Sequence, residues 1–231
     1  MSPSLPVSII LVHGWFGTPS HWEPTLQELR SSGAELTAVD LPLTSLADNV
    51  TRVDQAINTA KYPVILVGHS YGGAVITQAG NHEKVKGLVY IAAFAPEAGQ
   101  SIGDISAMYP LPSGSDLLLK DGILLMNPSR YHANMGADLS ESEGWAMSVS
   151  QKPVAAITGK ENVIKPSWKD KKSWYAISTE DKMIDPVAQR WMSGRMGADT
   201  IEIKGSHYTL TSQPKPVSAL ILKAANAIVA A

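Results

Sequence analysis

The fold of this chain is decided by the stretch Val64-Ile65-Leu66-Val67-Gly68-His69-Ser70-Tyr71-Gly72-Gly73. Four consecutive β-branched or leucine residues predict a buried strand, and a helical pattern continues through Gln78. Between them, Gly68 and Gly72 lie two residues before and two residues after Ser70, in the spacing G-x-S-x-G. A side chain at either glycine would collide with the neighbouring strand or helix, and the tight turn holds the serine in strained backbone geometry. The motif therefore predicts a sheet whose carboxyl edge presents the Ser70 hydroxyl.

Six apolar, β-rich runs are the strand candidates of the chain. Their near-continuous apolarity is typical of strands that are covered on both faces. Helical patterns follow most of them, and this alternation predicts an α/β fold with a mostly parallel sheet of about six strands and helices on both faces. The candidate strands are Val7–Val12, Glu35–Leu41, Val64–Val67, Val85–Ala93, Ser173–Ser178 and Thr200–Lys204.

Three capping pairs and one apolar repeat predict helices. In two of the pairs a serine is followed three residues later by an acid, as in a capping box, and in the third an aspartate precedes a first-turn proline. The stretch Val217–Ala231 has apolar residues at helical spacing, which predicts an amphipathic helix docked on the core. The capping pairs are Ser20 with Glu23, Ser45 with Asp48, and Asp185 with Pro186.

One long stretch interrupts the alternation of strands and helices. Roughly eighty residues separate the strand that ends near Ala93 from the strand that begins near Ser173, far more than an ordinary connection. We expect residues 97–170, approximately, to form an insertion within a single domain of residues 1–231. This insertion is either a connection with its own small core or a helical cap over the substrate. Short helices are predicted at Leu117–Leu119, Ser140–Ser150 and Val154–Gly159.

The composition excludes several kinds of site and partner. The chain has 231 residues, 19 Lys and Arg against 21 Asp and Glu, a formal net charge of −2, and no cysteine. Without cysteine there are no disulfides, thiolate nucleophiles or zinc-finger sites, and a near-neutral charge argues against nucleic acid as a partner. No apolar run approaches the roughly twenty residues that span a membrane, and the first residues lack the basic start of a secretory signal. We therefore expect a cytoplasmic protein without a membrane partner.

The chain resembles the α/β-hydrolase superfamily, and within it the small serine esterases and the related plant-type hydroxynitrile lyases. The resemblance covers essentially the whole chain, from the His13-Gly14 turn after the first strand to a histidine before the last helix. It implies that the chain begins at what is usually the third strand of the full fold. It also implies that Ser70 is a nucleophile served by an aspartate and a histidine, in the chain order Ser, Asp, His.

A histidine base is needed because a serine hydroxyl is a poor nucleophile near neutral pH. His207 follows the last strand, where the family has its base. The remaining histidines are weaker candidates by position. His69 is inside the serine turn, His132 lies in the insertion, and His21 and His82 are expected at the surface.

The acid that orients the base is expected in the loop after the strand Ser173–Ser178. Asp185 already has a sufficient role as a helix N-cap. By resemblance Asp181 is favoured, because the family has an aspartate a few residues before an apolar pair and a proline. Glu180 remains the alternative.

The remaining site residues are two backbone donors and the side chains around them. A tetrahedral intermediate needs two N–H groups aimed at its oxyanion. One is expected from Tyr71, directly after the nucleophile, and by resemblance the other comes from Trp15. The motif His82-Glu83-Lys84-Val85-Lys86 has a lysine where the second histidine of a zinc site belongs, so no metal or other cofactor is implied. The side chains and backbone expected to contact the substrate belong to Phe16, Gly14, Trp145, Met108 and Tyr208.

Together these residues predict a serine carboxylesterase for a small, largely apolar ester, which can carry an aromatic acyl or alcohol part. A hydroxynitrile lyase, a cofactor-free perhydrolase and a receptor without turnover remain as alternatives. The resemblance implies that lyases have Thr or Asn after the first-strand histidine, and that the S-selective lyases have Lys after the catalytic histidine. This chain has Gly14 and Tyr208 at those positions, and both favour ester hydrolysis.

Overall fold

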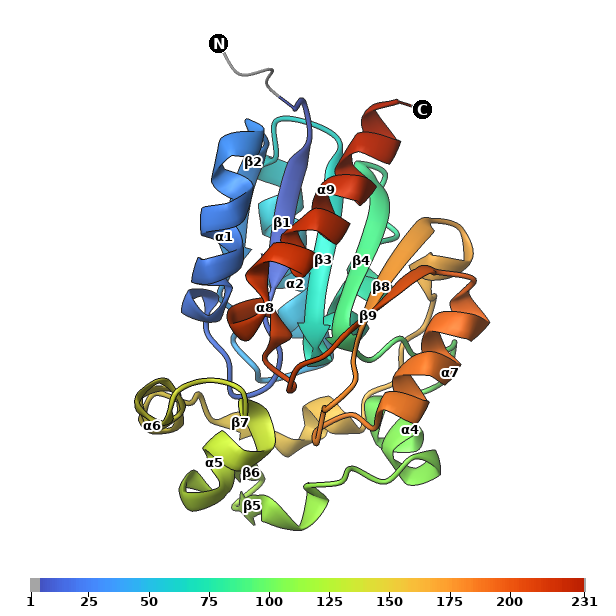
Figure 1. The fold of residues 1–231 in the computed structure, drawn as a ribbon. Coiled ribbons are helices and arrows are strands. Elements are labelled where there is room, and N and C mark those ends of the chain that lie inside the picture. The colour runs from blue at the N-terminus through green and yellow to red at the C-terminus, as the bar shows by residue number, and fades with distance from the viewer. Residues whose placement is uncertain (1–4, 231) are drawn as a thin grey trace.

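A parallel six-stranded sheet forms the centre of the molecule in the computed structural model, which describes residues 5–230 (Figure 1). Residues 1–4, which belong to the expected amino-terminal start, and Ala231 of the last predicted helix lie outside the described residues. The strand order is β2-β1-β3-β4-β8-β9, and every neighbouring pair is parallel. The strands are β1 Ser8–Val12, β2 Glu35–Val39, β3 Val64–Ser70, β4 Val85–Ala93, β8 Lys172–Ser178 and β9 Asp199–Ile203.

Burial follows the position of each strand in the sheet. All residues of β1 and β3 are buried, as are all residues of β4 except Lys86. The edge strands β2 and β9 keep exposed or half-buried residues. Continuous apolar runs are stable in the middle of the sheet because helices cover both of its faces. The predicted α/β fold with about six strands is confirmed.

The helices of the sheet form two layers. The crossover from β1 to β2 carries α1 on one face of the sheet, and the crossovers from β2 to β3 and from β3 to β4 carry α2 and α3 on the other (Figure 1). This is the arrangement expected of right-handed crossovers that run in opposite directions along the sheet. The last long helix, α9, packs beside α1, and α7 packs on β8 (Figure 1). The helices are α1 Glu23–Leu29, α2 Leu46–Thr59, α3 Tyr71–Ala79, α7 Pro186–Met196, α8 Thr209–Ser212 and α9 Pro214–Val229, with short 3-10 turns at Pro19–Trp22 and Arg30–Ser32.

Two of the three capping predictions are correct. The Ser45 Oγ accepts the Asp48 N–H at 3.0 Å, and the Asp185 carboxylate accepts the Val187 N–H at 2.8 Å. The capping box of Ser20 with Glu23 is wrong. Ser20 lies inside a 3-10 turn, and α1 begins only at Glu23, because a proline in its first turn sets the helical backbone there.

Most of the segment of residues 97–170, here called the cap segment, lies beyond the carboxyl ends of the central strands, and its last residues return along α3 to the start of β8 (Figure 1). It combines short helices with a small antiparallel sheet of order β5-β6-β7. Its elements are α4 Ile102–Met108, a 3-10 turn Gly114–Asp116, β5 Leu117–Lys120, β6 Ile123–Met126, α5 Pro128–Met135, α6 Glu141–Val149, β7 Val154–Ala155, and 3-10 turns Ala156–Gly159 and Ser167–Lys169.

The helix predictions within the cap segment are partly wrong. The predicted helix at Ser140–Ser150 is present as α6, and Ser140 forms its capping box. The one at Leu117–Leu119 is instead strand β5, because Asp121 and Gly122 both have positive φ and turn the chain into a hairpin. The one at Val154–Gly159 is a two-residue strand followed by a 3-10 turn.

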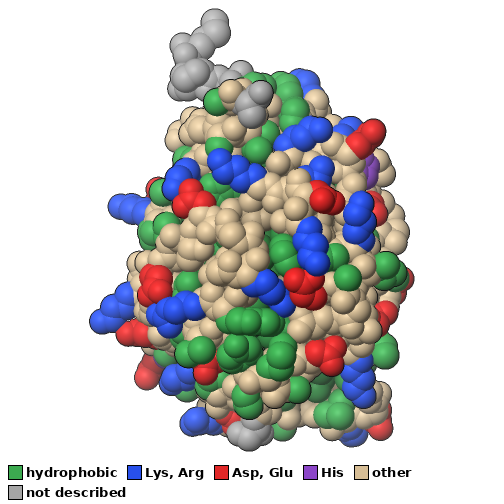
Figure 2. All heavy atoms as spheres, turned by 90° about the vertical axis from the view of Figure 1, so that its right-hand side faces the viewer, with side chains coloured by type: hydrophobic (Ala, Val, Ile, Leu, Met, Phe, Trp, Pro, Cys, Tyr) green, Lys and Arg blue, Asp and Glu red, His purple; other side chains and the backbone are tan. Residues whose placement is uncertain are grey.

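Charges of both signs are mixed over the surface that Figure 2 shows. Lys and Arg side chains alternate with Asp and Glu side chains, without a broad area of one sign on this face of the described chain. Apolar side chains gather in its lower half, at the height of the cap segment. No helix within residues 5–230 has the length and apolar character needed to cross a membrane.

Candidate functional site

Ser70 lies at the turn from β3 into α3, in a strained backbone conformation with φ 55° and ψ −124°. The neighbouring glycines make this turn possible. A Cβ on Gly68 would lie 2.6 Å from the carbonyl oxygen of Gly72, and a Cβ on Gly72 would lie 2.4 Å from the carbonyl oxygen of Val12. Both distances are far below van der Waals contact, so the turn requires glycine at both positions.

The loop after β1 lies directly against Ser70. A Cβ on Gly14 would lie 2.5 Å from the Ser70 Cβ and 3.1 Å from its Oγ, so the backbone of Gly14 touches the serine side chain. The buried His13 side chain holds this loop. Its Nε2 accepts the Leu41 N–H at 3.0 Å, which leaves the hydrogen on Nδ1 to donate to the Gly14 carbonyl at 2.9 Å. Because Trp15 directly follows Gly14, these contacts also fix the distance of the Trp15 backbone from Ser70.

His207 and Asp181 form a buried pair behind the serine. The Nδ1–H of His207 donates to Asp181 Oδ2 at 2.8 Å, and both side chains are almost completely buried. The other carboxylate oxygen accepts the N–H groups of Met183 and Ile184 at 2.7 and 3.0 Å, and Gln189 Nε2 donates to Oδ2 at 2.8 Å. These donors fix the position of the carboxylate against the His207 ring. With Nδ1–H so engaged, Nε2 is left to accept a proton.

The alternative acids lie elsewhere. Glu180 is exposed and lies 3.8 Å from the Lys204 ammonium. Asp185 caps α7. Asp181 is thus the carboxylate of this loop that contacts His207.

Two further histidines are buried beneath the site. The Nε2–H of His69 donates to the backbone carbonyl of His207 at 2.9 Å, and burial, reinforced by the nearby His207 ring, holds the pKa of His69 well below its usual value. His21 is also buried, contrary to the surface position expected, because the 3-10 turn packs its ring 5.0 Å from that of Tyr208. Burial, and then the neighbouring His13, lower the pKa of His21 to about 4. Both imidazoles are neutral at pH 7.

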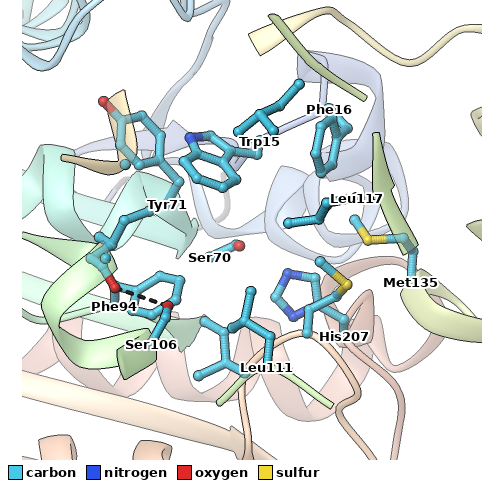
Figure 3. A pocket seen from close by; sticks show the side chains of 16 residues that line it. Trp15, Phe16, Ser70, Tyr71, Phe94, Ser106, Leu111, Leu117, Met135 and His207 are labelled. Atoms are coloured by element: carbon cyan, nitrogen blue, oxygen red, sulfur yellow. Dashed lines mark hydrogen bonds between the residues drawn. The ribbon is translucent and has the colours of Figure 1, made fainter. Parts of the chain in front are cut away.

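Ser70 and His207 face one cavity of about 190 Å3 at the carboxyl end of the sheet (Figure 3). The Ser70 hydroxyl and the His207 ring are not hydrogen-bonded to each other in the described chain, and such pairs tighten when a substrate orders them. The described lining residues include no Asp, Glu, Lys or Arg. They are Trp15, Phe16, Ser70, Tyr71, Phe94, Ile102, Gly103, Ser106, Leu111, Leu117, Leu124, Met135, Gly159, Met183, Ile184 and His207.

Of the expected substrate contacts, Phe16 lines this cavity and Gly14 abuts Ser70, but three others lie outside the lining. Trp145 is 66% exposed on α6, which packs against α5. Met108 ends α4 and is half exposed, whereas an earlier turn of that helix faces the cavity. Tyr208 points away into the core, where its hydroxyl lies 2.8 Å from that of Tyr131. These three expectations are corrected.

Most of the cavity wall was not expected from the sequence. The cap segment supplies Leu117, Leu124 and Met135 from three different elements. Phe94 directly follows β4, and its place at the carboxyl end of a parallel strand is a signal that could have found it. His132, the candidate in the insertion, lies outside this cavity and bonds through Nε2 to the Leu139 carbonyl at 2.9 Å. Within residues 5–230, no group of three or more His, Asp and Glu side chains is arranged to hold a metal ion.

Known proteins share this architecture. The model of the alpha/beta hydrolase family matches residues 9–220. The esterase PIR7B of Oryza sativa subsp. japonica is 26% identical over 98% of each chain, and salicylic acid-binding protein 2 of Nicotiana tabacum is 24% identical over 94% of this chain and 96% of its own. A solved pyrethroid hydrolase from Sphingobium faniae JZ-2 has a TM-score of 0.83 over 96% of this chain and 98% of its own, at 19% identity. At that identity the likeness concerns the fold alone.

Proposed function

This chain belongs to the alpha/beta hydrolase family, and on that premise we propose that it is a serine carboxylesterase for a small, largely apolar ester. One observation carries the proposal. The strained Ser70 and the His207 ring, which the buried Asp181 holds, face one apolar cavity. The esterases among its relatives support the same class of reaction.

The proposed reaction passes through an acyl-enzyme. Ser70 Oγ attacks the carbonyl carbon of the ester while its proton passes to Nε2 of His207, and His207 then protonates the leaving alcohol. Asp181 holds the Nδ1–H tautomer and stabilises the imidazolium that forms. Water, losing its proton to His207, attacks the acyl-enzyme, and the acid leaves as Ser70 regains its hydrogen.

The oxyanion of each tetrahedral intermediate is assigned to two backbone donors. Tyr71 begins α3, so its N–H is unpaired within the helix and lies at the positive end of the helix dipole. Trp15 follows Gly14, whose backbone touches Ser70. Two such donors supply a large part of the rate enhancement in acyl transfer.

The cavity lining supports an uncharged substrate. Among the described lining residues, His207 is the only acidic or basic side chain, so a charged group would lose its hydration without gaining a partner there. Trp15, Phe16, Tyr71 and Phe94 provide aromatic walls. The relative named for binding salicylic acid supports an aromatic acyl part.

The test of this proposal is hydrolysis of p-nitrophenyl esters by Ser70→Ala. We expect kcat to fall by about 10^4-fold or more, because the histidine and aspartate contribute little without the nucleophile. The matched control is Ser150→Ala, which removes an exposed serine at the end of α6 and should keep the wild-type rate. Full activity of Ser70→Ala would overturn the proposal.

The lyase alternative is disfavoured at both diagnostic positions. A side chain at position 14 would overlap Ser70 unless the loop moved away, and position 208 holds a buried tyrosine bonded to Tyr131. We expect no cyanide release from racemic mandelonitrile above the level without enzyme. Release above that level would revive the lyase.

The proposal also includes the organisation of the chain. We take residues 1–231 as one domain with a cap at residues 97–170, supported by the cavity contacts of Leu117, Leu124 and Met135. Cytoplasmic residence stays a prediction from the sequence, which fractionation of the native cells would test.

A further inference from the structure

The loop that carries His207 is bonded to the cap segment as well as to the sheet. The Tyr208 N–H donates to the carbonyl of Met135 at 3.0 Å, and the Ser206 hydroxyl approaches the same carbonyl at 3.3 Å. Met135 also lines the cavity beside His207 (Figure 3). The end of α5 therefore forms both a wall of the cavity and a support of the proposed base.

Asp138 is the side chain of the cap segment that bonds to Ser206 in this loop. Its Oδ2 accepts the Ser206 N–H at 3.1 Å and the Ser212 hydroxyl at 2.7 Å, and its Oδ1 accepts the Ser206 hydroxyl. The carboxylate comes so close that a Cβ on Gly205 would lie 3.0 Å from Oδ2. Two of these hydrogen bonds go to Ser206 in the loop and the third goes to Ser212 at the end of α8, so one exposed carboxylate ties the loop to the helix that follows it.

The position of these bonds along the chain matters for His207. Ser206 directly precedes His207, so bonds to its backbone N–H and its hydroxyl hold the residue from which the chain enters the histidine. On the other side, Asp181 holds the ring, and His69 Nε2–H holds the carbonyl. The bonds from Asp138 and from the Met135 carbonyl come from the cap segment, and among them Asp138 supplies the side-chain carboxylate.

We propose that Asp138 is a positioning residue, which holds the Gly205–Tyr208 loop so that the His207 ring faces Ser70. This inference rests on the proposed serine esterase function. Removing the carboxylate leaves the Ser206 N–H without its partner and lets the loop move relative to the cavity. Because Asp138 lies outside the cavity lining, substrate binding should change little while the chemical steps slow.

The test compares Asp138→Ala with Glu143→Ala. Glu143 offers the same contacts to a serine, since it accepts the N–H and the hydroxyl of Ser140, but it serves only the start of α6. On p-nitrophenyl acetate we expect kcat of Asp138→Ala to fall between about 10- and 100-fold with KM within about twofold, the range that a small misplacement of a reacting group costs. Glu143→Ala should keep kcat within about twofold.

A second readout follows the chemistry of Ser70 directly. Covalent labelling by paraoxon needs the serine and its base but no substrate turnover, so labelling of folded Asp138→Ala should slow by about the same factor as kcat. If Asp138→Ala does not fold by circular dichroism, Asp138→Asn decides in its place, because it keeps the shape and one acceptor oxygen. A fivefold or larger loss in that variant supports the inference, and a smaller loss overturns it.

The outcomes separate this inference from the proposed function. If wild-type protein is not labelled, or Ser70→Ala remains active, the proposed function fails. If wild type is labelled and Asp138→Ala reacts less than about fivefold more slowly, or Glu143→Ala slows equally, only the role of Asp138 fails.

Discussion

The contact between Gly14 and Ser70 predicts a large effect from the smallest possible side chain. In Gly14→Ala the added Cβ would lie 2.5 Å from the Ser70 Cβ, whereas ordinary contacts begin at 3.4 Å. The atoms nearest to this Cβ are the Ser70 side chain and the His69 carbonyl oxygen, and none of them is the flexible end of a long side chain. The loop and the serine must therefore separate by close to 1 Å, the difference between those two distances.

The magnitude follows from what that separation does to the oxyanion donor. Trp15 directly follows Gly14, so its N–H moves with the loop. A hydrogen bond of about 2.9 Å that lengthens by this amount is no longer a hydrogen bond. Losing one oxyanion donor costs about 10^2- to 10^3-fold in kcat, or about 2.7–4 kcal/mol in the barrier. We expect this loss in kcat with little change in KM, because the donor acts mainly in the transition state.

The assay is steady-state hydrolysis of p-nitrophenyl acetate at pH 8, with folding checked by thermal unfolding. The matched control is Gly194→Ala in α7, where a Cβ meets no heavy atom within 4 Å. That variant should keep its activity and gain up to about 1 kcal/mol of stability, since alanine favours a helix over glycine. A folded Gly14→Ala with kcat within about threefold of wild type would refute the assignment of Trp15 to the oxyanion.

Three further predictions concern the acid, the pH dependence of stability and the cavity. Asp181→Asn should lower kcat by about 10^4-fold, while Glu180→Gln stays within twofold; the reverse in ester hydrolysis would move the acid by one residue. Because burial keeps His21 and His69 neutral in the folded protein, the unfolded chain binds more protons than the folded chain below about pH 6.5. As the pH falls below that value, each histidine should therefore lower the free energy of unfolding by about 1.4 kcal/mol per pH unit. For His21 this decrease should end at about pH 4. His21→Gln should flatten this slope by one proton in urea unfolding at pH 7, 6 and 5, and an unchanged slope would contradict the buried neutral state. Leu117→Trp narrows the cavity and should raise KM at least about tenfold for a p-nitrophenyl ester of an aromatic acid but not for the acetate; equal effects on both esters would argue against Leu117 as a cavity wall.

The central fold was readable from local pattern, because its signals are short and strong. Val64–Val67 is apolar throughout, which is typical of a strand covered on both faces, and Gly68 and Gly72 mark the turn around Ser70. Ser45 and Asp185 correctly predicted where two helices start, because capping depends on residues that are two or three positions apart. Such features need no knowledge of distant parts of the chain.

The secondary structure of the cap segment was predicted less accurately, although the sequence contains some of the patterns that indicate it. Asp121-Gly122 between apolar runs is a strong hairpin signal, and it outweighs the apparent helical spacing of Leu117–Leu119. The capping box of Ser101 with Asp104 likewise marks the start of α4. Short elements of this kind are stabilised by packing more than by their own propensity, so pattern alone assigns them poorly.

The sequence by itself determined the alternation of strands and helices, the turn that presents Ser70, and a histidine after the last strand. Only the tertiary structure decided that Asp181 rather than Glu180 meets His207, that Trp145 faces solvent, and that Asp138 reaches the loop before the histidine. The physical reason is the range of each interaction. Backbone conformation and capping are set by near neighbours in the chain. The direction of a side chain into a cavity depends on packing between elements that lie tens of residues apart.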